Sequence, residues 1–355
     1  MSHGGDIYSN KVNIDFSVSL NPFVREAFDG SFDDALKETA KRAFKRAGTY
    51  PDLKLVSLRE SIAKAEGVSA EMIVPGNGAS EVLMSAIRST DPKNVLLPVP
   101  CFTGYEHILK GIKDCKVGRY FINEPFDTGE DLADFISGSE EKIDLLILTD
   151  PGNPIGKNID ENVLIKLLKE AAKRNIKVIL DESFYYLSEK GFSDKAGRVR
   201  ELTDEYENLI IIRSYTKLFA LPGIRMGCSI SGKVLADKIN DNLPEWNISV
   251  INEEIMSSLC VWADDDFIKS SIELIRGERN RLFEELKKRC EKVYPSDSVY
   301  ITLKGKTDLY DKMLDKGILI RDLGDVPGLE KGYYRVAVKK REENEALLKA
   351  MDEVM

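Results

Sequence analysis

The sequence predicts an α/β protein with a large, mostly parallel sheet and a smaller α+β domain built from both chain ends. In the middle of the chain, short β-rich runs alternate with helical patterns, which is typical of a parallel sheet covered by helices. The N-terminal segment and the chain after about Pro244 instead combine helical patterns with short β-rich pieces. We therefore expect a large domain over residues 31–243 and a small domain over residues 1–30 and 244–355.

The apolar pattern locates the individual elements. Buried strands of the large domain are expected at residues 145–148, 176–180, 209–212 and 228–230. Apolar residues at helical spacing predict a helix over residues 163–172, between the first two of these strands. In the small domain we expect helices around residues 266–288 and 342–354, and strands at 299–301, 318–320 and 334–338.

Composition excludes several classes of protein. The net charge of −9 argues against a nucleic acid as partner, and only two histidines argue against a metal site or a Ser-His-Asp triad. The polar N-terminus and the lack of any run near ~20 apolar residues predict neither a signal peptide nor a membrane span. Five widely spaced cysteines without a Cys-x-x-Cys pair indicate reduced thiols in a cytoplasmic protein.

Polar side chains follow three of the predicted strands where each strand ends. Asp150 and Asn153 follow the first strand, Asp181 ends the second, and Ser214 and Lys217 follow the third. Ligands of open parallel sheets bind beyond the carboxyl ends of the strands. We therefore expect these side chains to meet at one edge of the sheet.

Lys217 is the most informative of these residues. It lies in an apolar stretch directly after a strand, where burial lowers the pKa of an amine and makes it nucleophilic. Asp181 alone would suit a strand end or a helix N-cap, but beside Lys217 it offers an acid for a pyridine nitrogen. Arg225, between two glycines, offers a cation for a phosphate. Amine, acid and cation together are what a pyridoxal phosphate (PLP) site requires.

Four further features are candidates for the same site. The glycine loop Gly76–Glu81 precedes a helical run and can cradle a phosphate. Asn153 suits a turn, but its amide can also donate to a ring oxygen. Phe102 can belong to the core or stack on a cofactor. Arg335 can lie at the surface or bind a substrate carboxylate.

Two rival motifs lack support elsewhere in the chain. Ser214-x-x-Lys217 matches penicillin-binding proteins and related β-lactamases, which also need Ser-Asp-Asn and Lys-Thr-Gly. The chain offers only Ser296-Asp297-Ser298 and Lys306-Thr307-Asp308. Gly76-Asn77-Gly78 lacks the third glycine of the dinucleotide-binding fingerprint.

Seven motifs, in this order, resemble those of the fold-type I PLP enzymes, the class I and II aminotransferases, over nearly the whole chain. They are Tyr50-Pro51-Asp52 with Leu58-Arg59, Gly76-Asn77-Gly78, Asn153-Pro154-x-Gly156, Asp181-Glu182, Ser214-x-x-Lys217, Gly223-x-Arg225-x-Gly227 and Tyr334-Arg335-Val336. Within the family, the chain is most similar to the branch that holds histidinol-phosphate aminotransferase and threonine-phosphate decarboxylase. The resemblance implies the aspartate aminotransferase-like fold, with PLP as cofactor.

The resemblance also implies roles for the candidate residues. Lys217 should bind PLP as a Schiff base and move protons, and Asp181 should pair with the pyridinium nitrogen. The other implied cofactor ligands are Gly78, Ala79, Ser80, Ser214 and Arg225 at the phosphate, Asn153 at the 3-oxygen and Phe102 on the ring face.

For the substrate, the resemblance implies contacts with Arg335, Asn21 and Gly5, with Arg335 on the α-carboxylate. Tyr50 should reach the phosphate of the neighbouring subunit's cofactor, which implies a homodimer with shared active sites. The expected reactants are a small-molecule amino donor and a keto-acid acceptor.

One position departs from many aminotransferases, which carry a tyrosine three residues after the aspartate. Here that position is Phe184, which has no hydroxyl for the 3-oxygen, and Tyr185 would point elsewhere in a regular strand. The opening segments His3-Gly4-Gly5, Asp15-Phe16-Ser17 and Asn21-Pro22 resemble threonine-phosphate decarboxylase more than histidinol-phosphate aminotransferase.

The leading hypothesis is a PLP-dependent aminotransferase that acts on a small amino acid or amine, phosphorylated or not. A PLP lyase similar to threonine-phosphate decarboxylase is the close alternative, because the bond that stands perpendicular to the ring is the one that breaks. A non-catalytic PLP-binding regulator is the distant alternative. Such regulators usually need a DNA-binding domain, and too few residues precede the motifs to form one.

Overall fold

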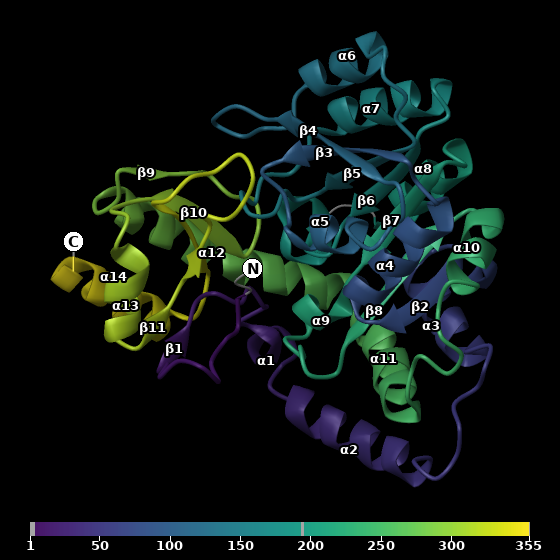
Figure 1. The fold of residues 1–355 in the computed structure, drawn as a ribbon. Helices are drawn as coiled ribbons and strands as arrows, with labels where there is room; N and C mark the ends of the chain where they lie inside the picture. Colours follow the sequence, from purple (N-terminus) through teal and green to yellow (C-terminus); the bar gives the residue numbers. More distant parts are fainter. Residues whose placement is uncertain (1–3, 193–194, 355) are drawn as a thin grey trace.

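A seven-stranded sheet forms the centre of the computed structural model, which describes residues 4–192 and 195–354 (Figure 1). In spatial order its strands are β2 (Ile73–Asn77), β8 (Met226–Ser231), β7 (Leu209–Arg213), β6 (Lys177–Asp181), β5 (Leu145–Thr149), β3 (Asn94–Val99) and β4 (Lys116–Phe121). Neighbouring strands are parallel except at β8, which is antiparallel to β2 and β7. The prediction of an α/β fold with a mostly parallel sheet is confirmed.

Side chains along each strand point alternately to the two faces of the sheet. A different set of helices covers each face. In β6, Val178 and Leu180 join one buried cluster and Ile179 joins another. The first cluster includes residues of α3 (Val56–Glu66), α6 (Glu130–Gly138), α7 (Glu161–Lys173), α8 (Lys195–Glu205) and α11 (Val250–Trp262). The second includes residues of α4 (Ala79–Thr90), α5 (Gly104–Leu109) and α10 (Lys233–Asn240).

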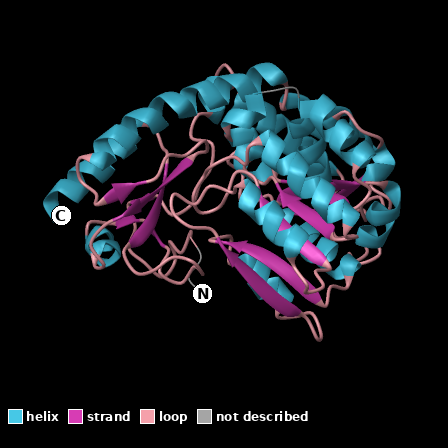
Figure 2. Cartoon of the chain, turned by 90° about the horizontal axis from the view of Figure 1, so that it is seen from above, coloured by secondary structure: helices cyan, strands magenta, loops and turns pink. Residues whose placement is uncertain are grey.

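A smaller antiparallel sheet lies beside the large one (Figures 1 and 2). Its strand order is β12 (Arg321–Asp322), β13 (Tyr333–Ala337), β10 (Tyr300–Lys304) and β9 (Lys292–Val293). The helices nearby are α12 (Asp265–Lys287), α13 (Leu309–Asp315) and α14 (Arg341–Val354). Asp264 caps the start of α12, where its carboxylate accepts a hydrogen bond from the N–H of Phe267.

The chain ends meet in a two-stranded parallel sheet, where β1 (Ile14–Asp15) pairs with β11 (Ile318–Leu319). The remaining helical elements are α1 (Val24–Ala27), α2 (Phe32–Lys45), α9 (Tyr215–Leu218) and the 3-10 turns η1 (Ala70–Met72), η2 (Tyr185–Leu187) and η3 (Glu189–Phe192). Helix α11, which the predicted boundary at residue 244 assigns to the small domain, packs against α2 and α3. The division into domains itself stays a prediction.

The structure differs from two expectations about local structure. The segment predicted as one strand at 318–320 is divided at Ile320, because β11 pairs with β1 whereas β12 pairs with β13. Tyr185 lies in the turn η2 and not in a strand, since β6 ends at Asp181. Its side chain is nevertheless turned away from the position of Phe184, into the fully buried interior.

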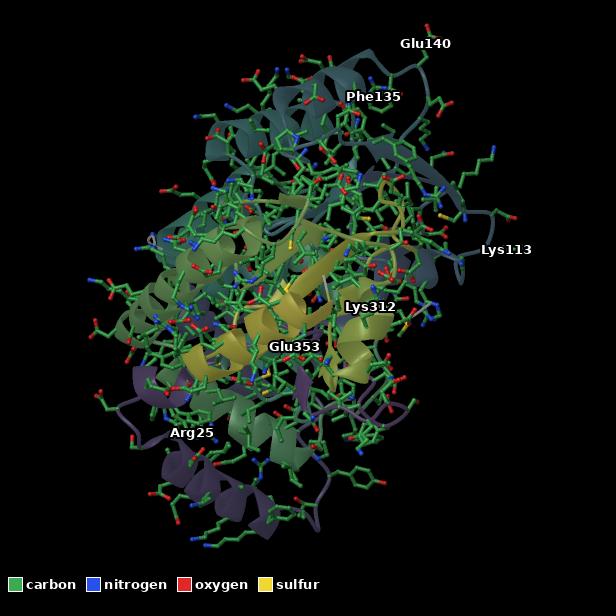
Figure 3. All side chains as sticks on the ribbon, turned by 90° about the vertical axis from the view of Figure 1, so that its left-hand side faces the viewer. Arg25, Lys113, Phe135, Glu140, Lys312 and Glu353 are labelled. Atoms are coloured by element: carbon green, nitrogen blue, oxygen red, sulfur yellow. The ribbon has the colours of Figure 1, made fainter. Side chains whose placement is uncertain are left out.

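Charged side chains cover the outside of the molecule. Figure 3 shows Arg25, Lys113 and Glu140 on the surface, and all three are exposed. Within residues 4–192 and 195–354, no helix combines the length and the apolarity needed to span a bilayer.

Ile211, fully buried in β7, provides a test of this core. Replacing it with alanine should lower the free energy of unfolding by ~2–5 kcal/mol, because a cavity remains where the side chain packed. The matched control is Val234→Ala, since Val234 is 72% exposed and its loss should change stability by under ~0.5 kcal/mol. Denaturant unfolding of both variants measures the difference, and equal stabilities would contradict this packing.

Candidate active site

A cavity of about 220 Å³ lies at the carboxyl edge of the large sheet. Its walls come from the segments that follow β3, β5, β6 and β7, from the start of α4 and from the smaller sheet. The predicted site residues that line it are Ala79, Ser80, Phe102, Asn153, Asp181, Ser214, Lys217, Arg225 and Arg335. Residues more than 250 positions apart in sequence therefore surround one space.

Lys217 lies on the single turn α9, directly beyond β7. Burial, Arg225 and Arg335 lower the pKa of its amine to about 8, although Asp181 opposes this shift. Its Nζ lies 5.7 Å from the centre of the Phe184 ring. Above about pH 8 the amine is neutral and therefore able to attack an aldehyde.

Asp181 is held in place by three hydrogen bonds. The hydroxyl of Tyr105 donates to its Oδ2 at 2.7 Å. The backbone N–H and hydroxyl of Ser183 donate to its Oδ1 at 3.0 and 2.6 Å. The hydroxyl oxygen of Tyr105 also lies 2.8 Å from the hydroxyl oxygen of Thr149. The carboxylate of Asp181 therefore belongs to a hydrogen-bonded chain with Tyr105 and Thr149. A carboxylate fixed in this way presents a constant acceptor to a pyridinium nitrogen.

The start of α4 and Arg225 form a cradle for an anion. Gly78 has φ of +86°, and a Cβ on it would lie 2.7 Å from Nη2 of Arg225. A Cβ on Gly227 would lie 2.4 Å from the N of Ala79. Both glycines are therefore required for the helix N-terminus and the guanidinium to come together. Free N–H groups of a helix start and a guanidinium both bind phosphate well.

Arg335 projects from β13 into the cavity. Its Nη1 donates to Oδ1 of Asn153 at 2.6 Å, and its Nη2 donates to the carbonyl oxygen of Ser17 at 3.1 Å. Its buried Nε has no partner within the described part of the chain. Burial lowers the pKa of Arg335 to about 10, with Arg321 adding to the shift and Tyr300 opposing it.

These contacts also orient Asn153. Because its carbonyl oxygen accepts from Arg335, its NH₂ group is the donor that remains for another partner. Phe102 lines the cavity and packs edge-on against Tyr105, with ring centres 5.5 Å apart.

Four predicted residues, Tyr50, Gly5, Asn21 and Gly78, are not among the residues that line the cavity. Tyr50 is 79% exposed and packs against Trp246. Gly5 adjoins the lining residue Gly4, and its N–H donates to the Ser17 hydroxyl. Asn21 is buried, and its side chain contacts Ser271 and the N–H of Phe23.

Asn21 nevertheless contacts the site through its backbone, since its N–H donates to the carbonyl oxygen of Lys217 at 3.0 Å. Gly78, although it forms the cradle with Arg225, is likewise not a lining residue. The position of His3 lies outside the described residues.

The sequence did not single out several residues that line the site or support it. Tyr105 sits within α5, where nothing in the sequence separates it from a core tyrosine. Arg321 in β12 stands directly opposite Arg335 in β13, and the register of the two strands sets this position. Asn252 donates to the carbonyl oxygen of Arg225 at 2.7 Å and fixes its backbone. Each of these contacts is long-range.

The residues present fit PLP. The cavity offers a nucleophilic amine, a fixed carboxylate and a cradle that glycine alone permits. The Nε of Arg335, which has no hydrogen-bond partner among the described residues, can donate to a bound molecule. Among the described residues, no group of three His, Cys, Asp or Glu side chains is placed to hold a metal ion.

The comparisons with known proteins agree with this geometry. The family model described as aminotransferase class I and II matches residues 12–351. A protein of Caldanaerobacter subterraneus subsp. tengcongensis, provisionally named threonine-phosphate decarboxylase, is 33% identical over 98% of this chain and 92% of its own. Histidinol-phosphate aminotransferase of Pyrococcus furiosus is 30% identical over 91% of this chain and 87% of its own.

Among solved structures, histidinol-phosphate aminotransferase from Clostridium acetobutylicum is similar with a TM-score of 0.83. It is 29% identical, and the match covers 96% of this chain and 98% of that chain. Fold, family model and relatives agree over nearly the whole length. The chain therefore belongs to the class I and II aminotransferases, a family of PLP-dependent enzymes.

Proposed function

We propose that this protein is a PLP-dependent aminotransferase whose amino donor carries an anionic group in addition to any that Arg335 binds, such as a phosphate ester. The observation that carries the proposal is the charge of the cavity. Three guanidinium groups line it, those of Arg225, Arg321 and Arg335, besides the Lys217 amine, against the single carboxylate of Asp181 among the described lining residues.

The anions needed to balance this charge come from two sources. The cofactor phosphate would occupy the cradle at Arg225, since that guanidinium contacts the start of α4. Arg321, which also pairs with Asp325, and Arg335 are adjacent across two strands and would face the substrate. Two neighbouring guanidinium groups suit either a carboxylate with a phosphate or one phosphate bound by both.

The names of the relatives support this substrate class. One is named for threonine phosphate and the others for histidinol phosphate, and both compounds are small phosphorylated amino compounds. The far wall also contains Leu323 and Val326, which would pack against the apolar part of such a molecule and exclude water.

Bound PLP would act as an electron sink for a bond to the substrate Cα. Asp181, whose carboxylate is held by Tyr105 and Ser183, would keep the ring nitrogen protonated. The Lys217 Nζ, with its lowered pKa, would take a proton from the Cα side and return it. Arg335, by holding the carboxylate, would decide which Cα bond stands perpendicular to the ring.

Decarboxylation is the second candidate reaction. Phe184 favours it, because it lies near Lys217 and has no hydroxyl for the 3-oxygen at the position where many aminotransferases carry a tyrosine. The relative with 33% identity also bears a decarboxylase name.

A homodimer with shared sites is also proposed. Its support is a surface patch of exposed apolar side chains near Tyr50, which is itself 79% exposed. The other members of the patch are Leu53, Val56 and Trp246. Tyr50 from a second copy would then complete the phosphate cradle. The five thiols support the expected cytoplasmic location.

A single-turnover assay tests the reaction. PLP-loaded protein is mixed with O-phosphothreonine or histidinol phosphate without a keto acid, and carbon dioxide and the cofactor form are both followed. Transamination predicts about one equivalent of pyridoxamine phosphate per subunit and no carbon dioxide. Sustained carbon dioxide release from O-phosphothreonine would contradict it and identify a decarboxylase. The Lys217→Ala protein should give neither product.

Arg335→Ala tests the substrate end. Losing the guanidinium should weaken transition-state binding of a carboxylate-bearing substrate by ~2–5 kcal/mol, because a buried charge pair is broken. The matched control is Arg341→Ala, since Arg341 is 58% exposed and pairs only with Glu278 among the ion pairs described. Steady-state kcat/KM of both variants provides the comparison, and equal values would exclude Arg335 from the site.

A further inference from the structure

A carboxylate behind the active site has no assigned role. Glu66, the last residue of α3, is fully buried and is not a lining residue of the cavity. Its Oε1 accepts hydrogen bonds from the hydroxyls of Tyr186 and Tyr215 at 2.5 and 2.6 Å. Its Oε2 lies 3.3 Å from Nε of Arg213. Three donors thus converge on one buried acid.

Arg213 connects this acid to a second one. It is fully buried and forms ion pairs with both Glu66 and Glu182. Nη1 of Arg198 lies 2.7 Å from the other oxygen of Glu182. Arg198 also pairs with Glu161, so Glu66, Arg213 and Glu182 belong to a larger network of ion pairs. Burial lowers the pKa of Arg213, but the carboxylates of Glu182 and Glu66 outweigh burial and raise it, so the guanidinium stays charged.

The members of this cluster alternate with active-site residues in the sequence. Glu182 follows Asp181, and Arg213 and Tyr215 stand on either side of Ser214. Asp181 and Ser214 line the cavity, whereas their three neighbours point to the cluster around Glu66. The cluster thus holds the ends of β6 and β7 on the side that faces away from the cavity.

The turn that carries Lys217 needs such support. Helix α9 has only four residues, and one isolated turn has little stability of its own. The side chain of its N-cap residue, Ser214, makes no capping hydrogen bond. Tyr215, the first residue of the turn, is tied down through its hydroxyl to Glu66. Thr216, the second, is tied to the backbone of Met226.

Stability alone does not account for a charged cluster at this place. Buried ion pairs are often no more stabilising than apolar side chains of similar volume. Their directional contacts do fix one arrangement of the groups that they join. Here those groups are the strand ends that carry Asp181, Ser214 and Lys217.

We propose that Glu66 is a positioning residue for Lys217, and that it acts through Tyr215 and Arg213 to hold the amine at its place in the cavity. The inference rests on the proposed role of Lys217 as the cofactor lysine. Burial and the charge of Glu66 raise the pKa of both tyrosine hydroxyls far above neutrality, so that both remain donors.

Two matched variants separate positioning from stability. Tyr215→Phe and Tyr186→Phe each remove one buried hydroxyl that donates to the same Oε1 of Glu66. The two losses should lower Tm by similar amounts. Only Tyr215 lies on the turn with Lys217, so only Tyr215→Phe should displace the amine.

The readouts are the rate at which PLP-free protein binds PLP as a function of pH, and kcat and KM of the loaded protein. Tyr215→Phe should slow PLP binding and lower kcat about ten- to hundredfold with little change in KM, as expected for a small misplacement. The pH midpoint of PLP binding should move above the value of about 8 set by the buried amine. Tyr186→Phe should change these rates by no more than about twofold relative to the parent protein. That is well under the ~1.4 kcal/mol of a tenfold change.

Equal effects of the two variants on these rates, or no effect of Tyr215→Phe, would overturn the inference. Glu66→Gln gives a second test that does not depend on either tyrosine, since it keeps an acceptor but removes the charge opposite Arg213. It should lower kcat with KM preserved. If the parent protein and Lys217→Ala bind PLP equally fast, the role of Lys217 itself fails, and that result is distinct from failure of the cluster.

Discussion

The site depends on one constraint: the Lys217 amine is buried away from water, near two guanidinium groups. Burial, Arg225 and Arg335 all favour the neutral amine and bring its pKa to about 8. The same cations leave the cavity short of negative charge, since Asp181 is the one carboxylate among its described lining residues. The same arrangement therefore makes the lysine reactive and makes the cavity attract anions.

The large sheet creates this arrangement by bringing the ends of separate strands together. Parallel neighbours place Asp181 and Lys217 at the same edge. Arg225 directly precedes the antiparallel strand β8, whose first residues lie beside the end of β7, so Arg225 lies at that edge as well. The smaller sheet then closes the cavity with Arg321 and Arg335. Two parts of the cavity are thus built on different sheets, and the hydrogen bond from Arg335 to Asn153 joins them.

The sequence predicted those parts of the structure that are local. Apolar runs located β5, β6 and β7, and the polar residues at their ends identified Lys217 and Asp181. The glycine loop predicted as a phosphate cradle contains Gly78, whose positive φ is visible in the backbone. Tyr105, Arg321 and the acid Glu66 could not be found in this way. Each acts through a partner more than 10 positions away, and only strand pairing or packing determines that partner.

Reduction of the PLP-loaded protein with borohydride, followed by digestion and mass spectrometry, tests the central claim most directly. Reduction makes the link between PLP and its amine permanent, so the modified residue can be identified. The buried, nucleophilic amine described here predicts one PLP-derived mass per chain, located on Lys217 and absent from Lys217→Ala. A modification at another lysine, or none in a protein incubated with PLP, would contradict the proposed site.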